Sequence, residues 1–405
     1  MSLNQPDHED ALQALAAEID IPKEKAAEAR DHFMSLGEWL ERPESSIADY
    51  DPYVAPQGSF LLGTTNRPVA SCEKYDVDLI CRMNASKADF TQKALKEQVG
   101  MEIIAYAKAH KMAHEPEDKR RCWTLEYADG SQFHMDVLPC LPDAAGYQHK
   151  LEKSGFVELA QDTARVADAL AITDKEHPDY ARHCDEWPSS NPLGYAAWFR
   201  DRMAIRFQLR KAELAKERGI LAKVEDIPDH EVKTTLQKSI QLLKRHRDTM
   251  FADDMDHRPI SIILTTLAAK SYGNEERLVD ALSSILASLD VHIEQREDGK
   301  WIPNPVNPAE NFADRWAKDP ELERCFYRWL DTARRDFGLY LNASRPTEIP
   351  EILMERLGTG TVQKAVEGMI AAAVPAAASV PAVARVEEAV AEVRSAGRGT
   401  SPYCA

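Results

Sequence analysis

The chain has 405 residues, a hydrophobic fraction of 44% and a formal net charge of −17. This length accommodates two or three domains, and the apolar content is sufficient for ordinary hydrophobic cores. A surface this acidic repels a long polyanion, which argues against extended DNA or RNA as a substrate. Small anions are not excluded, because bound cations can invert the local charge of an acidic pocket.

The cysteines and the chain ends carry no signal for export. The seven cysteines are scattered, and no two of them form a Cys-x-x-Cys pair, which favours reduced thiols over a disulfide framework or a structural zinc site. Residues 1–10 lack the basic start and apolar core of a signal peptide. The Ala-rich stretch at 368–386 is interrupted by Pro375 and Pro381, which argues against a membrane-spanning helix. We therefore expect a cytoplasmic protein without a membrane partner.

The first third of the chain predicts a helix followed by a strand. Residues 21–40 have helical character, with apolar side chains near one face. Residues 75–81 alternate as a half-buried strand does. One face of this strand carries Val77, Leu79 and Cys81, and the other carries Asp76, Asp78 and Ile80.

A second helix and a hairpin complete this region. The helix is predicted over residues 91–111. Two alternating segments, 122–127 and 132–138, then flank Ala-Asp-Gly-Ser at 128–131, and Asp-Gly between such segments is a strong hairpin signal. The region therefore predicts helices packed on a mixed sheet, which is an α+β fold.

From about residue 168 the pattern becomes helical. The predicted helices cover residues 195–216, 232–247, 260–271, 275–289 and 320–337. Proline-rich connectors such as 303–308 separate them. Beyond residue 345 the composition shifts to Ala, Val, Gly and Ser, which predicts a mobile tail with one short amphipathic helix at 383–393.

These patterns predict three parts. The expected parts are a sheet domain with an N-terminal helix at 1–167, a helical domain at 168–345 that closes a cleft against it, and an Ala-rich mobile tail at 346–405.

Three aspartates have the spacing of a metal site. Asp76 and Asp78 are separated by one residue on a predicted strand, so their side chains project to the same face. Asp136 lies on a later hairpin strand and can supply a third carboxylate. Two Mg²⁺ or Mn²⁺ ions about 3.5–4 Å apart need such hard oxygen ligands. An Asp-x-Asp pair alone is more often a solvated face, so it is the combination with Asp136 that points to a metal site.

A glycine precedes the aspartates. Gly58 permits close approach of a phosphate to the backbone amides that follow it, and the Ser59 hydroxyl can add a hydrogen bond. A simple turn is the alternative for Gly-Ser at this place. The combination of Gly-Ser, then Asp-x-Asp, then a later Asp is more specific than any of its parts. It predicts an enzyme that transfers a nucleotidyl group from a nucleoside triphosphate.

The motifs resemble those of a known family. The segments QGSFLLGTTNRP, KYDVDLIC and FHMDVLPC are similar to the catalytic core of the bacterial cGAS/DncV-like nucleotidyltransferases (CD-NTases) of CBASS antiphage defence. Similar downstream segments are NPLGYAAWFRDRM, LQKSIQLLKRHRD, PISIILTTLAAKSYG and NPVNPAENFADRW. The resemblance covers roughly residues 21–340 and includes all three metal-ligand positions.

This resemblance implies a polymerase-beta-like core with a helical second domain. It implies that Asp76, Asp78 and Asp136 bind two divalent cations and that Gly58 and Ser59 contact the donor triphosphate. The substrates would be ATP together with GTP or a pyrimidine triphosphate. The product would be a cyclic di- or trinucleotide second messenger that acts on a downstream effector. In related operons a ubiquitin-transferase-like partner conjugates the C-terminus, and a mobile tail ending in small residues fits such a partner as well as it fits simple disorder.

Three further residues are candidate substrate contacts. Lys244 lies on the predicted helix at 232–247, from which the family places a lysine near the donor phosphates. Arg247 follows on the same helix, where a structural ion pair is the alternative. Ser261 lies at the predicted start of the next helix, where free amides favour anions, although a plain N-terminal serine is equally consistent.

The sequence also leaves two other functions open. One is a nucleotidyltransferase that modifies a protein, a tRNA or a small molecule with the same three aspartates. The other is a catalytically inactive relative that serves as a nucleotide-binding scaffold.

Overall fold

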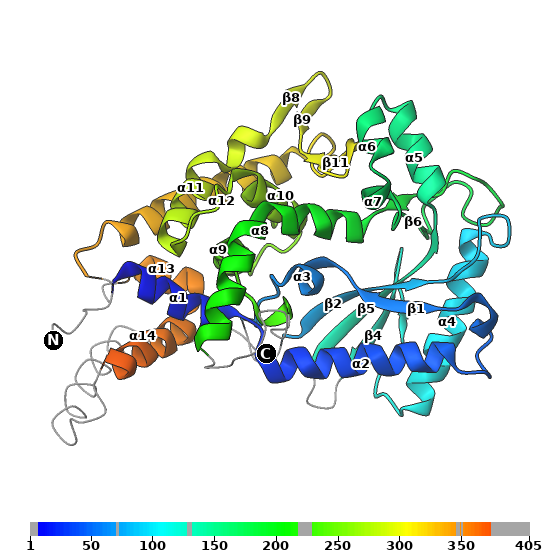
Figure 1. Cartoon of the computed structure of the whole chain (residues 1–405), viewed down its shortest axis with the longest axis horizontal. Coiled ribbons are helices and arrows are strands. Elements are labelled where there is room, and N and C mark those ends of the chain that lie inside the picture. The colour runs from blue at the N-terminus through cyan, green and yellow to red at the C-terminus, as the bar shows by residue number, and fades with distance from the viewer. Residues whose placement is uncertain are drawn as a thin grey trace. The chain divides into compact units, whose positions relative to one another are not determined.

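The computed structural model of the chain describes residues 7–69, 73–127, 132–217, 229–345, 349 and 351–373. They form two compact units, each assembled from segments that are distant in the sequence (Figure 1). The sheet unit contains residues 21–201 and 303–310, and the helical unit contains the described residues within 1–20, 202–302 and 311–405.

The sheet unit is built on one mixed sheet. Its strands are β1 (Tyr53–Pro56), β2 (Tyr75–Arg82), β3 (Glu117–Asp118), β4 (Trp123–Tyr127), β5 (Phe133–Pro142), β6 (Leu170–Ile172) and β7 (Ser189–Ser190). The strand order is β1-β2-β5-β4-β3, with β6 pairing with β5 and with β7. β2 and β5 are parallel and the other pairs are antiparallel. The predicted mixed sheet and the antiparallel hairpin are confirmed, while the hairpin turn at 128–131 lies outside the described residues.

The two faces of the sheet differ as the alternation predicts. Val77, Leu79 and Cys81 of β2 are buried in the main core of this unit. Helices α2 (Lys23–Glu41) and α4 (Gln92–Ala109) contribute side chains to the same core and lie alongside the sheet (Figure 1). The opposite face carries the aspartates and a small apolar cluster that includes Ile80.

Short elements complete the sheet unit. They are the 3-10 helix Ala48–Tyr50, α3 (Gly58–Leu62), α5 (Ala144–Lys153), α6 (Val157–Gln161) and α7 (Thr163–Val166). The proline-rich connector at 303–308 contains β10 (Pro303–Asn304) and the start of β11 (Asn307–Asn311). The Tyr147 hydroxyl donates a 3.0 Å hydrogen bond to the Val306 carbonyl, so this connector packs against α5 of the sheet unit.

The helical unit confirms the five predicted helices. They are α8 (Pro192–Glu217), which begins in the sheet unit, α9 (Thr235–Met250), α10 (Ser261–Ser271), α11 (Leu278–Ser288) and α12 (Pro320–Leu341). Short elements join them, namely the 3-10 helices Asp229–Glu231 and Leu289–His292 and the hairpin of β8 (Glu294–Arg296) and β9 (Gly299–Trp301).

Two features of this unit differ from the prediction. Helix α1 (His8–Ile19) was not predicted, although a reciprocal capping box between Asp7 and Asp10 starts it. The expectation of a mobile tail is wrong for its first part, which forms α13 (Glu351–Leu357) and α14 (Thr359–Ala373). The reason is burial, since both helices contribute apolar side chains to the core of the helical unit. The short helix expected at 383–393 lies outside the described residues.

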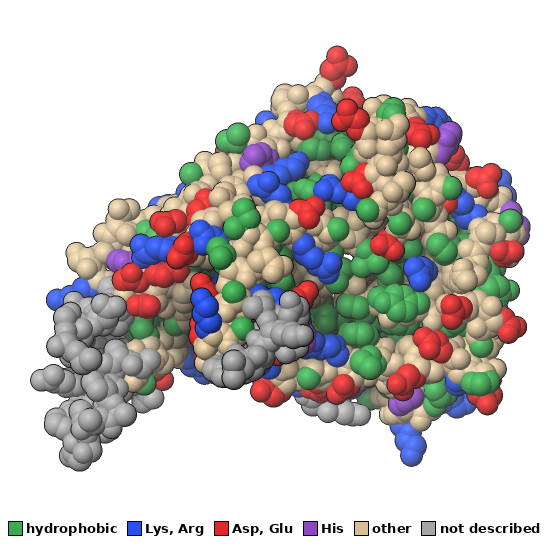
Figure 2. All heavy atoms as spheres, in the orientation of Figure 1, with side chains coloured by type: hydrophobic (Ala, Val, Ile, Leu, Met, Phe, Trp, Pro, Cys, Tyr) green, Lys and Arg blue, Asp and Glu red, His purple; other side chains and the backbone are tan. Residues whose placement is uncertain are grey.

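The surface carries both signs of charge. On the face shown in Figure 2, Lys and Arg side chains are interspersed with Asp and Glu side chains. Across the described ranges, no helix combines the length and the apolarity that crossing a bilayer requires.

Candidate active site

The register of two parallel strands brings the aspartates together. β2 pairs with β5 so that Asp78 lies opposite Asp136 and Asp76 lies opposite His134. Residues directly opposite in adjacent strands project to the same face, and neighbouring strands are about 4.8 Å apart. The prediction that Asp76, Asp78 and Asp136 share one face of the sheet is therefore confirmed.

Gly58 lies against Asp78. The Gln57 amide donates a 2.8 Å hydrogen bond to the Asp78 carbonyl, which fixes the β1–α3 turn beside β2. Gly58 has a φ of +59°, and a Cβ atom at this position would lie 2.3 Å from Asp78 Oδ2. Only glycine meets both conditions. The structure therefore brings Gly58 to Asp78, while the hydroxyl of Ser59, the next residue, lies 3.2 Å from that of Thr65.

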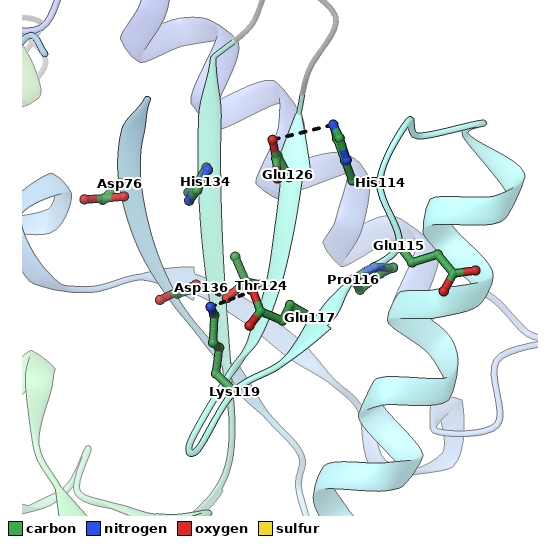
Figure 3. Close-up of a pocket in the computed structure, with 10 residues that line it drawn as sticks. All are labelled: Asp76, His114, Glu115, Pro116, Glu117, Lys119, Thr124, Glu126, His134 and Asp136. Carbon is green, nitrogen blue, oxygen red and sulfur yellow. Dashed lines mark hydrogen bonds and ion pairs between the residues drawn. The ribbon is translucent and has the colours of Figure 1, made fainter. Parts of the chain in front are cut away.

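A pocket of about 440 Å³ opens over the same face of the sheet. Figure 3 shows its lining side chains on β2, β5 and β4 and on the segment that precedes β4. The lining residues are Asp76, His114, Glu115, Pro116, Glu117, Lys119, Thr124, Glu126, His134 and Asp136. His114 lies in the loop that follows α4, which ends at Ala109. The pocket belongs entirely to the sheet unit and is predominantly acidic.

Hydrogen bonds fix the side chains around Asp136. Thr124 Oγ1 donates a 2.5 Å hydrogen bond to Asp136 Oδ1 from the neighbouring strand β4. Burial and the adjacent Asp136 carboxylate raise the pKa of Cys122 to about 11, so this thiol stays protonated at neutral pH. Sequence reasoning missed Thr124, although the hairpin register that pairs it with Asp136 was an available signal.

Nearby cations partly balance the acidic lining. Glu126 forms an ion pair with Lys74, and His114 Nε2 lies 3.6 Å from Glu126 Oε1. The hydrogen bond to Glu117 raises the pKa of Lys119, and the Asp136 charge acts in the same direction. Asp76 of β2 and Asp136 of β5 are the aspartates that line this pocket.

The donor set fits divalent cations. Carboxylate oxygens are hard ligands of the kind that Mg²⁺ and Mn²⁺ prefer. The three aspartates do not form a cluster with all ligand atoms within 4.8 Å of one another. Two ions about 3.5–4 Å apart require ligands spread over a wider region than a single ion does.

The other candidate residues lie in the helical unit. Arg247 Nη1 donates to the Pro259 carbonyl at 2.9 Å and to Ser261 Oγ at 3.0 Å, and Nη2 pairs with Asp248 at 2.6 Å. Burial lowers the pKa of Arg247. These contacts match the structural ion pair proposed as its alternative role, and they place Ser261 at the start of α10 as predicted. Lys244 lies on α9 with 7% exposure. The substrate contacts of these three residues stay predictions.

Comparison with known proteins agrees with this geometry. Residues 52–139 match the family described as "Cyclic GMP-AMP synthase DncV-like, nucleotidyltransferase domain". The chain is 28% identical over 332 residues to a c-di-GMP synthase of Roseivirga ehrenbergii, covering 81% of this chain and 78% of that protein. It is 25% identical over 327 residues to the cyclic dinucleotide synthase CdnG of Bradyrhizobium diazoefficiens, covering 79% of this chain and 73% of that protein.

Solved structures show the same fold. The B. diazoefficiens CdnG structure in complex with GTP superposes with a TM-score of 0.65 at 22% identity, covering 88% of this chain and 97% of that chain. The Escherichia coli MS115-1 CdnC structure in complex with HORMA gives a TM-score of 0.56 at 16% identity, covering 88% of this chain and 99% of that chain. Together with the aspartates opposed on β2 and β5, these matches show that the chain is a nucleotidyltransferase similar to the cGAS/DncV-like family (CD-NTases).

Proposed function

We propose that this enzyme joins ribonucleoside triphosphates into a cyclic dinucleotide or trinucleotide by metal-dependent nucleotidyl transfer. The observation that carries the proposal is the register of β2 and β5, which sets Asp78 opposite Asp136 with Asp76 on the same face. Gly58 beside Asp78 supports it, because a bare backbone at that place allows a triphosphate to approach.

Each residue has a role in this proposal. Asp76, Asp78 and Asp136 hold two Mg²⁺ or Mn²⁺ ions, and Thr124 orients the Asp136 carboxylate. The ions, when bound, activate the attacking ribose hydroxyl and neutralise the charge that develops on the pyrophosphate leaving group. Ser59 contacts the donor triphosphate. Lys244, Arg247 and Ser261 of the helical unit are further candidate contacts with substrate, as the motifs of the chain imply.

The relatives support the choice of substrate and product. Two of them are named as synthases of c-di-GMP and of a cyclic dinucleotide, and CdnG was solved with GTP. We therefore propose purine triphosphates, GTP and ATP, as the first substrates to test. A pyrimidine triphosphate is the next candidate.

The cellular role that we propose rests on the family resemblance. We propose that the product is a second messenger of antiphage defence, made in the cytoplasm, that acts on a downstream effector. The C-terminal tail would be the site of a ubiquitin-transferase-like partner. Residues 374–405 lie outside the described part of the chain.

The test is product analysis. The purified chain is incubated with all four ribonucleoside triphosphates and Mg²⁺ or Mn²⁺, and phosphatase-resistant products are identified by mass spectrometry. We expect a cyclic product from the wild type and from Asp298→Asn, a matched control on the exposed β8–β9 turn. The double variant Asp76→Asn/Asp78→Asn should lose at least about 10³-fold in rate, since the ions stabilise several kcal/mol of charge in the transition state.

Two results would contradict the proposal. Transfer of label to a protein, tRNA or small molecule instead of a cyclic product would favour the alternative nucleotidyltransferase. Nucleotide binding without turnover under all these conditions would favour the inactive scaffold.

A further inference from the structure

A second group of metal-ligating side chains lies on the connection between β6 and β7. His177, Asp179 and Cys184 each offer a ligand atom, and these atoms all lie within 4.8 Å of one another. The three side chains are half-buried. They are contributed by eight consecutive residues, so one short loop presents a nitrogen, an oxygen and a sulfur donor to the same point.

This donor set has a preferred metal. Imidazole and thiolate together favour Zn²⁺ over Mg²⁺ or Ca²⁺, which prefer oxygen ligands. Zn²⁺ is commonly bound by three protein ligands of this kind, with a water or another ligand in the fourth tetrahedral position. We propose that His177, Asp179 and Cys184 form a Zn²⁺ site that is separate from the aspartates of β2 and β5.

Backbone hydrogen bonds give the loop its shape before any ion binds. The His177 amide donates to the Asp174 carbonyl at 3.0 Å, and the Tyr180 amide donates to the His177 carbonyl at 3.0 Å. The Lys93 amide at the start of α4 donates to the Tyr180 carbonyl at 2.9 Å, which ties the loop to that helix. The ligands are therefore held together by the fold, which reduces the ordering that binding requires.

The base of the loop is anchored by Asp174. Its carboxylate accepts hydrogen bonds from Arg120 at 2.7 Å and from Arg121 at 2.9 Å. Its amide donates to the Gln92 side chain at 2.9 Å. These contacts connect the loop to β6, to α4 and to the segment before β4. The same loop leads directly into β7 and α8, so an ion bound here would stiffen the entry to α8.

The immediate contacts of His177 and Asp179 are weak or compatible with an ion. The Asp179 amide donates a 3.2 Å hydrogen bond to His177 Nδ1, so Nε2 is the ring nitrogen left to bind an ion. Asp179 pairs with Arg182 at 3.5 Å, but Arg182 is 77% exposed, and such a pair contributes little.

The cysteine pattern in the sequence did not predict this site. The search for Cys-x-x-Cys pairs finds sites with two or more thiolates, whereas this one uses a single cysteine with a histidine and an aspartate. The signal was the spacing His-x-Asp-x-x-x-x-Cys within one loop.

The experiment uses the full chain and measures metal content and spectra. The metal-free chain is loaded with Zn²⁺ and desalted, and zinc per chain is determined by elemental analysis. A second sample is loaded with Co²⁺, because thiolate-to-cobalt charge transfer gives an absorption band that carboxylates cannot give. The variants are Cys184→Ser, Asp179→Asn and, as the matched control, Cys122→Ser.

The control is chosen because Cys122 lies beside Asp136 and would provide the sulfur if the ion were bound at the aspartates. We expect about one tightly held Zn²⁺ in the wild type and in Cys122→Ser, with the cobalt–thiolate band present in both. Cys184→Ser should lose the band, Asp179→Asn should hold zinc less tightly, and zinc should raise the Tm of the wild type but not of Cys184→Ser.

Three results would overturn the inference. They are wild-type protein that retains no zinc, a band that survives in Cys184→Ser, or a band that disappears in Cys122→Ser. None of these depends on nucleotide turnover, so the failure of this inference can be distinguished from the failure of the proposed synthase activity.

Discussion

The Asp136 carboxylate is held by a side chain on the neighbouring strand. Thr124 donates to its Oδ1 atom at 2.5 Å, and both residues line the pocket. Hydrogen bonds to metal-ligating carboxylates orient them, and their loss typically lowers metal affinity or activity by about 10–100-fold. Thr124 is thus a positioning residue that acts through Asp136.

This role predicts a change in metal dependence. Thr124→Val keeps the volume of the side chain but removes the donor, so we expect a 10-fold or greater rise in the Mg²⁺ concentration needed for half-maximal rate. Thr124→Ser retains the hydroxyl and is the matched control. A titration of Mg²⁺ at saturating triphosphate measures both. An unchanged Mg²⁺ dependence in Thr124→Val would remove Thr124 from this role.

Gly58 provides a second prediction at the scale of single residues. Gly58→Ala places a Cβ 2.3 Å from Asp78 Oδ2, so it should displace that carboxylate and abolish most of the activity. Gly155→Ala is the matched control, because Gly155 also has a positive φ, of +85°, but has open space around it. Both variants should lose about 1–2 kcal/mol of stability from backbone strain. Initial rates measure the effect of the clash with Asp78, and thermal melts measure the backbone strain that both variants share. Equal activity of Gly58→Ala and Gly155→Ala would contradict the proposed contact between Gly58 and Asp78.

Among the elements, α4 is locked to the sheet by an aromatic side chain. The Trp123 indole donates a 2.9 Å hydrogen bond to the Lys96 carbonyl, and its ring occupies the space above Gly100. A Cβ on Gly100 would lie 2.2 Å from this ring. The contact therefore sets the distance between α4 and β4, the strand that carries Thr124.

This packing predicts opposite effects of two Gly→Ala substitutions within helices. Gly100→Ala should destabilise the chain by about 1–3 kcal/mol, because overpacking moves a buried indole. Gly338→Ala lies inside α12 with no neighbouring atom within 4 Å, so it should stabilise the chain by about 0.5–1 kcal/mol. Urea unfolding of both variants measures the difference. A stabilising Gly100→Ala would show that α4 is not held in this way.

A buried pair joins α9 to α12 and predicts a pH effect. His246 Nε2 lies 3.2 Å from Asp336 Oδ2, and burial lowers the pKa of His246 despite the opposing effect of Asp336. As the pH falls below about 6.5, the unfolded chain gains a proton on this histidine that the folded chain does not. The free energy of unfolding therefore decreases in this range. The pKa of Asp336 is also lowered, but its contribution is lost only below a pH of about 4.

The measurement is urea unfolding at pH 7.5 and pH 5.5. The decrease in the free energy of unfolding between these values should be smaller in His246→Gln than in the wild type, by up to about 1.4 kcal/mol per pH unit. His149→Gln, which alters an exposed histidine, is the matched control and should behave as the wild type. If the free energy of unfolding decreased as much in His246→Gln as in the wild type, groups other than His246 would cause the pH dependence.

At the scale of the whole molecule, local patterns predicted the elements well. The alternation of Val77, Leu79 and Cys81 predicted β2, and helical periodicity predicted α8 to α12. Helix α1 was missed although its buried residues, among them Leu12, Leu15 and Ile19, have helical spacing. It is stabilised by packing on α14, which lies near the other end of the described chain. Such long-range partners are not visible in a local window of sequence.

The sequence predicted part of the candidate site but not the strand pairing that assembles it. Because side chains alternate between the two faces of a strand, the sequence predicts that Asp76 and Asp78 share a face. It does not predict the parallel pairing that sets Asp78 opposite Asp136, because β2 and β5 are separated in the sequence by a helix and a hairpin strand. Its register depends on the packing of the whole sheet. The sequence also did not predict that each unit is assembled from discontinuous segments, because a shift in amino-acid composition marks only a local boundary along the chain.

The most direct test of the account is a double-mutant cycle on Asp78 and Asp136. Initial rates of product formation are measured for Asp78→Asn, Asp136→Asn and the double variant at saturating triphosphate and Mg²⁺. Because groups that act as one unit are strongly non-additive, each single variant should lose about 10³-fold or more and the double variant should lose little beyond that. If either single variant kept a rate within tenfold of the wild type, or if the two losses multiplied, the aspartates opposed on β2 and β5 would not form one catalytic metal site.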